Sequence, residues 1–310
     1  MMKKGGIVVI GSSNTDMVIQ SGCLPAPGET ILGGQFIMNP GGKGANQAVA
    51  AARLDGVVAF IAKVGNDVFG QEAVKGFQKH GIDTSFITID NEAPSGVALI
   101  MVDDKGENCI SVALGANSTM QKDEINKARK IIEQASFVLI QLEIPMEVVT
   151  YAVDLAKRLG TRVVLNPAPA QPLSDDLLSS LYIITPNETE TALLTGIKVE
   201  DESTARKAAR ILKDKGVDIV LITMGGRGAY VLSDDDDQIV PCPKVIAVDT
   251  TAAGDTFNGA LLVGLSDGIS LTEAIEFANK AAAFSVTKMG AQTSAPNRND
   301  LKMILNNTIA

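Results

Sequence analysis

Short apolar runs alternate with helix-length amphipathic segments along most of this 310-residue chain. Runs that are apolar almost throughout are typical of parallel strands buried on both faces. The strands predicted in this way are 7–11, 57–65, 137–143, 161–167, 182–187 and 218–226. The predicted helices, with apolar residues at helical spacing, are 44–54, 69–81, 122–135, 145–160 and 203–216. The pattern therefore predicts an α/β protein whose mainly parallel central sheet carries helices on both faces.

Two stretches, about 15–38 and 94–114, interrupt this alternation. They contain hairpin-like strands with Gly, Pro and Asp-Asp-Lys-Gly turns, and no helix crosses between them. We expect a small antiparallel lid over the sheet; the alternative is a decorated edge of the main sheet. An exposed lid face would favour pairing with a second chain. With no long repeat or low-complexity linker, residues 1–310 are predicted to form one domain that carries this lid.

The charge balance excludes several classes of partner. The chain has 27 Lys and Arg against 36 Asp and Glu, a net charge of −9, and no basic stripe, which argues against nucleic acid. The N-terminal apolar run is too short for a signal peptide, and no stretch approaches the ~20 apolar residues of a membrane span. We therefore expect a cytoplasmic protein with no membrane partner. The acidic run 233–238 is expected to be a solvated hairpin tip, with a metal site as the alternative.

Histidine and cysteine usage narrows the chemistry further. The only histidine, His80, precedes Gly81 and is expected to end a helix, where glycine adopts the left-handed cap. Ser-His-Asp hydrolysis and His-rich metal sites are therefore nearly excluded, and acid–base chemistry must use carboxylates, lysines or tyrosines. The widely spaced Cys23, Cys109 and Cys242 are expected to be small buried or half-buried residues, not disulfides or zinc ligands.

The segment 249–258, which reads DTTAAGDTFN, carries the strongest chemical signal. Apolar residues recur at every fourth position after it, so Gly254 and Asp255 are predicted to open a helix. The small side chains of Ala252, Ala253 and Gly254 leave their N–H groups free to approach an anion. Asp255 is either a simple helix cap, or it takes the proton of an attacking hydroxyl while the amides hold charge developing on a phosphoryl group.

A second glycine cluster opens the predicted helix within 39–54, NPGGKGANQAVAAARL. Lys43 and Asn46 stand in its first turn, where they could reach a small polar ligand; the alternative is a plain glycine turn. Further polar residues at predicted strand ends are Asn14, Asp16 and Glu143. Carboxylates and amides at the carboxyl edge of a parallel sheet suit a polyhydroxylated ligand, because vicinal hydroxyls pair with both groups.

The two familiar nucleotide fingerprints, GxxxxGK[ST] and GxGxxG after the first strand, are absent. Instead, GGKGANQAVAAARL and DTTAAGDTFNGA are very similar to the two signature regions of the PfkB-type carbohydrate kinases. The similarity runs from SSNTD at 12–16 to GAQTS at 290–294, nearly the whole chain. The resemblance implies transfer of a phosphoryl group from ATP to the 5-hydroxyl of a sugar, D-ribose.

The resemblance also implies roles for individual residues. Asp255 would be the catalytic base, and Ala252, Ala253 and Gly254 the anion hole. The sugar-binding residues would be Asn14, Asp16, Gly42, Lys43, Asn46, Glu143 and Asp255. The ATP-binding residues would be Asn187, Thr223, Gly225, Gly226, Arg227, Gly228, Gly254 and Asn279. Asn279 stands where the family usually has histidine. From the residues alone, 187–190 (NETE) is equally an N-cap with an acidic first turn, and 223–228 (TMGGRG) a glycine-rich turn.

Two cations and a second subunit are implied in the same way. Asn187 and Glu190 would organise Mg²⁺, largely through water, since Mg²⁺ keeps several of its waters. A monovalent cation, K⁺, would be held by Asp249, Thr251, Ser285, Lys288, Gly290 and Ser294, several of them through backbone carbonyls. Lys288 can contribute only its C=O. The alternative is a chain that needs no such ion. A homodimer through the lid strands is also implied.

Two rival functions remain open at this point. The nearer is another kinase of the same family, acting on a nucleoside, fructose or deoxyribose. The chain has no Trp, three Tyr and nine Phe, which favours a free sugar over a base that needs a stacking surface. The other rival is a non-catalytic sugar or nucleotide sensor, which would not need a base at Asp255.

Overall fold

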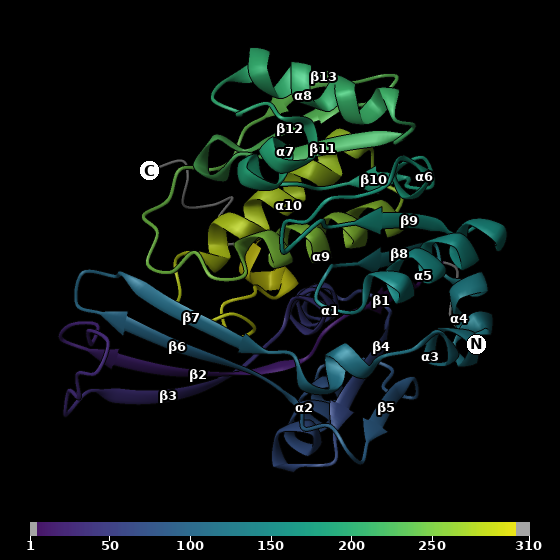
Figure 1. Ribbon diagram of the computed structural model, residues 1–310. Helices are drawn as coiled ribbons and strands as arrows, with labels where there is room; N and C mark the ends of the chain where they lie inside the picture. The colour runs from purple at the N-terminus through teal and green to yellow at the C-terminus, as the bar shows by residue number, and fades with distance from the viewer. Residues whose placement is uncertain (1–4, 302–310) are drawn as a thin grey trace.

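The computed structural model describes residues 5–301; residues 1–4 and 302–310, at the two ends of the predicted 1–310 domain, lie outside the described part. A nine-stranded sheet forms the middle layer, in the order β13-β12-β11-β10-β9-β8-β1-β4-β5 (Figure 1). Its strands are β1 (Ile7–Ile10), β4 (Val58–Gly65), β5 (Ile87–Asp90), β8 (Phe137–Ile140), β9 (Arg162–Leu165), β10 (Ile183–Ile184), β11 (Ile219–Thr223), β12 (Ala229–Leu232) and β13 (Asp237–Val240). Along this order, all the strands from β11 to β5 are parallel to one another, and β12 and β13 add an antiparallel edge beside β11.

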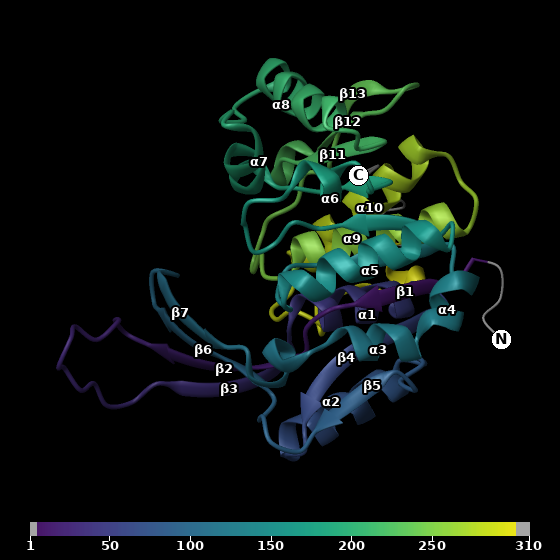
Figure 2. The ribbon, with the colours of Figure 1, turned by 45° about the vertical axis from the view of Figure 1, so that its right-hand side comes forward.

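Helices cover both faces of this sheet, as the sequence predicts (Figure 2). They are α1 (Lys43–Arg53), α2 (Val68–Lys79), α3 (Lys122–Lys127), α4 (Arg129–Gln134), α5 (Met146–Arg158), α6 (Asp175–Leu178), α7 (Glu188–Thr195), α8 (Glu202–Asp214), α9 (Ala253–Ser266) and α10 (Leu271–Ser285), with the short 3₁₀ helices η1 (Gly115–Thr119) and η2 (Gly225–Arg227). Alternate side chains of β1 enter two separate cores. Val8 and Ile10 pack with α3, α4, α5 and α8, whereas Ile7 and Val9 pack with α1, α9 and α10.

The segment 122–135, predicted as one helix, is two helices that meet at Ala128. Ala128 has ψ near 0° and serves as both the C-cap of α3 and the N-cap of α4. The break keeps Ile125, Ala128 and Ile132 fully buried in one core. The free energy gained by burying these apolar side chains therefore decides the local structure over the continuous helix that the sequence pattern predicts.

The lid is a separate four-stranded sheet in the order β3-β2-β6-β7, which projects from the body (Figure 2). It comprises β2 (Asn14–Ser21), β3 (Gln35–Gly41), β6 (Gly96–Asp103) and β7 (Asn108–Ala113). Each hairpin is antiparallel, as predicted, but the central pair β2·β6 is parallel. Both of these strands follow parallel strands of the main sheet and leave it in the same direction, which explains the parallel contact.

Three local predictions can be compared with the structure. His80 is the C-cap of α2 and Gly81 has φ of 74°, as expected. Cys23 and Cys109 are exposed and only Cys242 is half-buried, so the expectation of burial is wrong for the two cysteines in the lid region, which has no helix layer over it. The acidic run forms the turn between β12 and β13. Residues 5–301 contain no group of three or more metal-ligating side chains, and none of their helices is long and apolar enough to cross a membrane.

Candidate active site

Two adjoining cavities open at the carboxyl edge of the main sheet, where open parallel sheets bind their ligands. The smaller, of about 210 Å³, lies beside the first turns of α1, α7 and α9. The larger, of about 670 Å³, extends over β11 toward α10. The residues that line both cavities are Asn187, Thr223, Thr250, Ala253 and Gly254. Because the walls are shared, a ligand in the larger cavity can extend into the smaller.

The N-terminus of α9 provides the donors of the smaller cavity. Ala252, its N-cap, has φ of 58°, a left-handed conformation that costs a non-glycine residue about 1–2 kcal/mol. Within the described residues, the N–H groups of Gly254 and Asp255 have no hydrogen-bond partner. Such first-turn donors, together with the helix dipole, favour an anion. Strain of this kind is concentrated at functional sites, and the sequence offered no sign of it.

Asp255 is the third residue of α9, and its buried carboxylate does not cap the helix. Asn46 Nδ2 donates to Asp255 Oδ2 (3.0 Å), and Gln47 Nε2 donates to Asp255 Oδ1 (2.9 Å). Both donors come from the first half of α1, which packs against α9. The interpretation of Asp255 as a simple cap is therefore wrong. Its carboxylate is instead held at the wall of the smaller cavity.

Lys43 begins α1 and lines the same cavity as Asp255. The negative charge of Asp255 raises the pKa of the Lys43 ammonium further above its ordinary value, so the side chain stays charged. The backbone before it requires glycine: Gly42 has φ of 91°, and a Cβ there would lie 2.7 Å from Asn14 N. The glycine turn thus allows α1 to begin against the lid strand β2.

The predicted sugar ligands Asn14, Asp16 and Glu143 come together beside this turn. Burial, followed by the charges of Glu143 and Asp255, raises the pKa of Asp16 to about 6. Glu143 Oε2 accepts hydrogen bonds from Ser12 Oγ (2.5 Å) and from Lys43 N (3.0 Å). One oxygen of Glu143 therefore holds the start of α1 in place, a role that its position at a strand end did not suggest.

Asn14 is oriented by a buried amide that the sequence did not single out. Asn117 Nδ2 donates to Asn14 Oδ1 (2.8 Å) and to Leu114 O (2.9 Å), and Asn117 Oδ1 accepts from Ser13 N (2.9 Å). These contacts join β2 to the chain that returns from β7. Asn117 consequently links the lid to one of the predicted sugar ligands.

Asn187 and Glu190 form a capping box at the start of α7. Asn187 Oδ1 accepts from Glu190 N and Glu190 Oε2 accepts from Asn187 N, each at 2.8 Å. The structural interpretation of NETE therefore holds. Both side chains also line the smaller cavity, and burial raises the pKa of Glu190. Carboxylate and amide oxygens at the wall of a polar cavity fit a Mg²⁺ ion that retains most of its waters.

The larger cavity joins a glycine-rich turn to an apolar wall. Several residues of the predicted ATP-binding set line it, among them Thr223, Gly225, Gly226, Gly228 and Asn279. The apolar wall comes from Val245, Ala247, Phe257, Ala282, Ala283 and Val286. A cavity with apolar walls and a few polar groups suits a planar base.

Two members of the predicted ATP set use their side chains elsewhere. Arg227 is not part of the cavity wall; its guanidinium pairs with Glu188 and donates to Glu200 O. The amide of Asn279 donates to Val240 O (2.9 Å), so it secures the end of β13 while facing the cavity.

The predicted K⁺ ligands lie on two segments that meet beside α9. Val248 N and Asp249 N both donate to Val286 O (2.7 and 3.1 Å), and Asp249 Oδ2 accepts from Gly290 N (2.8 Å). Burial alone would raise the pKa of Asp249, but hydrogen bonds from Thr251 and Gly290 outweigh it and lower the pKa. The carboxylate of Asp249 thus joins the two segments that carry the predicted K⁺ ligands. Ser285 and Ser294, which flank Val286 and Gly290 in the sequence, are buried. The Ser285 hydroxyl donates to Ala282 O, and the Ser294 hydroxyl donates to Ala291 O.

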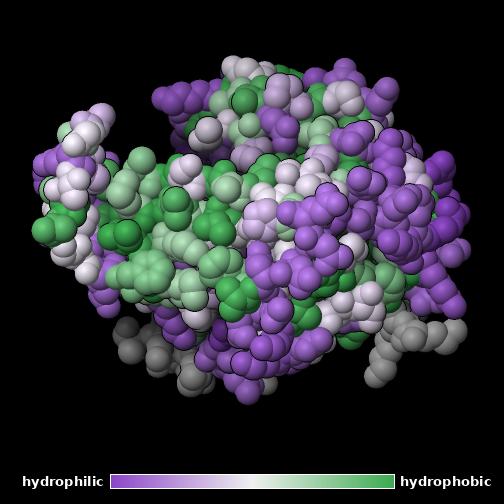
Figure 3. Space-filling model, turned by 60° about the horizontal axis from the view of Figure 1, so that its bottom comes forward, coloured by the Kyte–Doolittle hydropathy of each residue, from purple (hydrophilic) through white to green (hydrophobic). Residues whose placement is uncertain are grey.

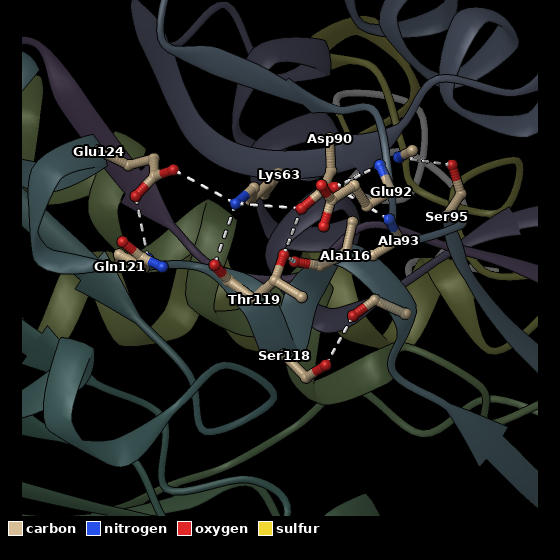
Figure 4. A network of polar contacts seen from close by, with 12 residues as sticks. Lys63, Asp90, Glu92, Ala93, Ser95, Ala116, Ser118, Thr119, Gln121 and Glu124 are labelled. Carbon is tan, nitrogen blue, oxygen red and sulfur yellow. Dashed lines mark hydrogen bonds and ion pairs between the residues drawn. The ribbon is translucent and has the colours of Figure 1, made fainter.

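The base of the lid is anchored by an ionic network (Figure 4). Lys63 Nζ lies 3.1 Å from Asp90 Oδ2 and 3.5 Å from Glu124 Oε1, and it donates to Thr119 O (3.0 Å). Thr119 Oγ1 donates to the same oxygen of Asp90 (2.7 Å). The network joins β4 and β5 to η1, through which the chain re-enters the body from the lid.

Several residues at the site were missed from the sequence. They are Gln47, Asn166, Thr185, Thr250 and Asn258, and all but Gln47 line the smaller cavity. Asn166 and Thr185 directly follow β9 and β10, but the predicted strands 161–167 and 182–187 extended past both residues and so hid them from the rule that identified Asn14 and Glu143. Gln47 was visible only as a polar residue in an alanine-rich helix.

Comparison with known proteins agrees with this geometry. The model of the pfkB family carbohydrate kinases matches residues 4–298. The chain belongs to the pfkB family of carbohydrate kinases, which confirms the resemblance seen in its two glycine-rich segments.

Within the family, this chain is similar to enzymes that act on pentoses. A ribokinase from Haemophilus influenzae is 47% identical over 294 residues, which cover 95% of this chain and 96% of that protein. A deoxyribokinase from Salmonella typhi is 37% identical over 292 residues, covering 94% and 95%. The solved structure of Arabidopsis thaliana ribokinase complexed with ribose and ATP has a TM-score of 0.89 at 32% identity and covers 97% of this chain and 98% of that chain.

Proposed function

We propose that this protein transfers the γ-phosphoryl group of ATP to the 5-hydroxyl of D-ribose and so forms D-ribose 5-phosphate and ADP. One observation carries the proposal: the carboxylate of Asp255, the free N–H groups at the start of α9 and the ammonium of Lys43 surround a single polar cavity. The adjoining larger cavity has the size and lining for a nucleotide. The ribokinases among the relatives support the choice of acceptor.

The groups in the smaller cavity have complementary roles in this reaction. Asp255 accepts the proton of the 5-hydroxyl while the hydroxyl oxygen forms a bond to the γ-phosphorus. The bond from that phosphorus to the β–γ bridging oxygen breaks, and ADP leaves. Lys43 and the N–H groups of Gly254 and Asp255 neutralise negative charge on the transferring group, which is the main contribution that proteins make to phosphoryl transfer.

The sugar is held by the polar groups between the lid and α1. Asp16 and Asn14 reach it from β2, and Asn46 reaches it from α1. Asn46 Oδ1 is buried without a partner in the described part of the chain, so it is free to accept a hydroxyl of the sugar. The lid excludes water from the site, which protects ATP from hydrolysis.

Two cations complete the proposal. Glu190 and Asn187 would hold Mg²⁺, largely through water, and the ion would supply positive charge to the phosphate oxygens. K⁺ would order the loop that leads into the N-terminus of α9, and its ligands would come from Asp249, Thr251, Ser285, Lys288, Gly290 and Ser294. Because ATP is the donor, we place the reaction in the cytoplasm.

We also propose that the protein is a homodimer through the lid strands. The strand register places Met17, Ile19, Phe36, Met38 and Leu99 on one face of the lid, and apolar surface gathers over this part of the molecule (Figure 3). Contiguous exposed apolar patches of this kind mark interaction surfaces. Sedimentation equilibrium should show a dimer that Phe36→Glu dissociates. Leu32→Glu, in the loop between β2 and β3, should remain dimeric; a monomeric wild-type protein would contradict the proposal.

Coupled ADP production from Mg·ATP tests the activity. The acceptors are D-ribose, 2-deoxyribose, fructose and a nucleoside, each in K⁺ and in Na⁺ buffer. Turnover that depends on ribose and rises with K⁺ is the expected result. Turnover with another acceptor only would retain the phosphoryl-transfer site and reject the sugar. Folded protein that binds ATP but turns over no acceptor would favour the sensor.

A further inference from the structure

A row of buried amide side chains lies behind the carboxylate of Asp255. Gln47 is fully buried, with 0% of its surface exposed. Its Nε2 donates to Asp255 Oδ1 (2.9 Å) and to Asn166 Oδ1 (3.0 Å), and its Oε1 accepts from Gln141 Nε2 (2.5 Å). Every hydrogen-bonding direction of this amide except one lone pair is therefore used, and each partner comes from a different part of the fold.

The orientation of the Gln47 amide follows from Asp255. An ionised carboxylate can only accept hydrogen bonds, so Gln47 must present Nε2 to it and Oε1 to Gln141. Gln141 must then present its own Nε2. The polarity of the whole row is set by the charge of Asp255.

The row is retained at an energetic cost. Gln141 Oε1 is buried without a hydrogen-bond partner among the described residues, and a buried acceptor without a partner loses the hydrogen bonds that it makes to water in the unfolded chain. Space for it depends on Gly11, because a Cβ there would lie 2.0 Å from Gln141 Oε1. An apolar side chain at 141 would avoid this cost, so the amides serve something other than stability.

The two donors to Asp255 differ in what else they can reach. Asn46 donates to Oδ2, and its own Oδ1 is buried without a partner among the described residues, where it can accept a hydroxyl of the proposed sugar. Gln47 has no exposed surface and does not line either cavity. Its contact with Oδ1 is therefore independent of the substrate.

We propose that Gln47 is the positioning residue of the catalytic base. Its hydrogen bond to Oδ1 holds the Asp255 carboxylate in one orientation and leaves Oδ2 to take the proton of the acceptor hydroxyl. The inference deepens the proposed function and rests on it.

Three variants test this role. Gln47→Met keeps the volume but removes the donor, and it should lower kcat roughly 10- to 100-fold, as expected for a general base that is present but misoriented. The KM for ribose and for ATP should change less than about threefold, because Gln47 touches neither ligand. Gln141→Met, one amide further from the base, should lower kcat much less.

Gln47→Glu provides a readout that a merely structural residue would not change. Two adjacent carboxylates share one proton, and one of the two pKa values is strongly raised. While the new carboxyl group is protonated it donates to Asp255 as the amide does, so activity is restored at low pH. As the pH rises and that proton is lost, kcat should fall relative to wild type. The ratio of Gln47→Met to wild type should instead be independent of pH.

The same assays contain the results that would overturn the proposal. Gln47→Met with wild-type kcat, or Gln47→Glu with the wild-type pH profile, would reduce Gln47 to a packing residue. So would a further loss when Gln47→Met is added to Asp255→Asn, since a residue that acts only through Asp255 adds nothing once the base is gone. A near-normal rate in Asp255→Asn would instead reject Asp255 as the base, whereas wild-type protein without ribose-dependent turnover would reject the proposed function itself. ATP binding and thermal unfolding confirm that each variant is folded.

Discussion

Asn46 Nδ2 lies 3.0 Å from Asp255 Oδ2, although 209 positions separate the two residues in the sequence. This hydrogen bond joins the first turns of α1 and α9, the two helices that follow the glycine-rich segments. The proposed sugar contact and the proposed base are thereby parts of one arrangement. A change in either helix should affect both binding and chemistry.

Asp255→Asn should lower kcat by at least the ~10²–10⁴ expected for loss of a general base. The amide fills the same space but cannot take a proton at neutral pH. Steady-state ADP production measures the loss. Asp267→Asn, at the far end of the same helix, should retain wild-type kcat. A near-normal rate in Asp255→Asn would remove Asp255 from the role of base.

Asp16→Ala should raise the KM for ribose and change kcat less. The pH dependence follows from the pKa of about 6, which is above the ordinary 3.8 because burial and neighbouring carboxylates disfavour the charge. Asp16 is ionised only above this pH, so ribose affinity should fall as the pH drops through about 6. Isothermal titration with ribose measures the dependence. Asp16→Asn should bind weakly at all pH values without that step, and an unchanged ribose KM would contradict the assignment.

Glu190→Gln should raise the Mg²⁺ concentration needed for half-maximal activity by about tenfold, as expected when a group that orients a metal site is lost. Glu273→Gln is a matched control, because Glu273 occupies the same capping-box position in α10, away from both cavities. A Gln oxygen can still accept the backbone cap hydrogen bond in both variants, and only Glu190→Gln should change the Mg²⁺ titration. Equal titration curves for the two would limit Glu190 to helix capping.

Asp249→Ala should abolish the activation by K⁺. The variant loses the carboxylate that accepts hydrogen bonds from Gly290 N and Thr251 N, so the side-chain contact between the two segments of the proposed cation site is lost. Rates in K⁺ and Na⁺ buffers should converge on the lower value. Asp104→Ala, in the exposed turn between β6 and β7, should keep its K⁺ response. Persistent K⁺ activation in Asp249→Ala would place the cation elsewhere.

Lys63→Met should lower the thermal unfolding midpoint by roughly 2–5 °C and leave kcat nearly unchanged. It removes the cation that Asp90 and Glu124 share at the base of the lid, where the Lys63 side chain is 11% exposed. Lys75→Met breaks an exposed ion pair with Glu72 and should have no measurable effect, since such pairs contribute little. Equal midpoints for the two variants would show that the network does not stabilise the lid base.

The fold was largely predictable because its signals are local. Apolar runs such as 137–140 and 219–222 are buried on both faces, and runs of this kind, alternating with amphipathic helices, favour a parallel sheet between two helix layers. The lid hairpins were visible from their turns. The parallel contact between β2 and β6 was not, because it depends on how two distant hairpins leave the sheet.

At the site, the sequence by itself determined which residue types were present: small residues before Asp255, glycines before Lys43, and polar side chains at strand ends. Only the tertiary structure decided which atoms meet. The positive φ of Ala252, the donation from Gln47 to Asp255 across 208 positions and the contact of Asn117 with Asn14 have no local signature. Hydrogen bonds act over about 3 Å, so the partner of a buried carboxylate is specified by the packing of helices and not by neighbours along the chain.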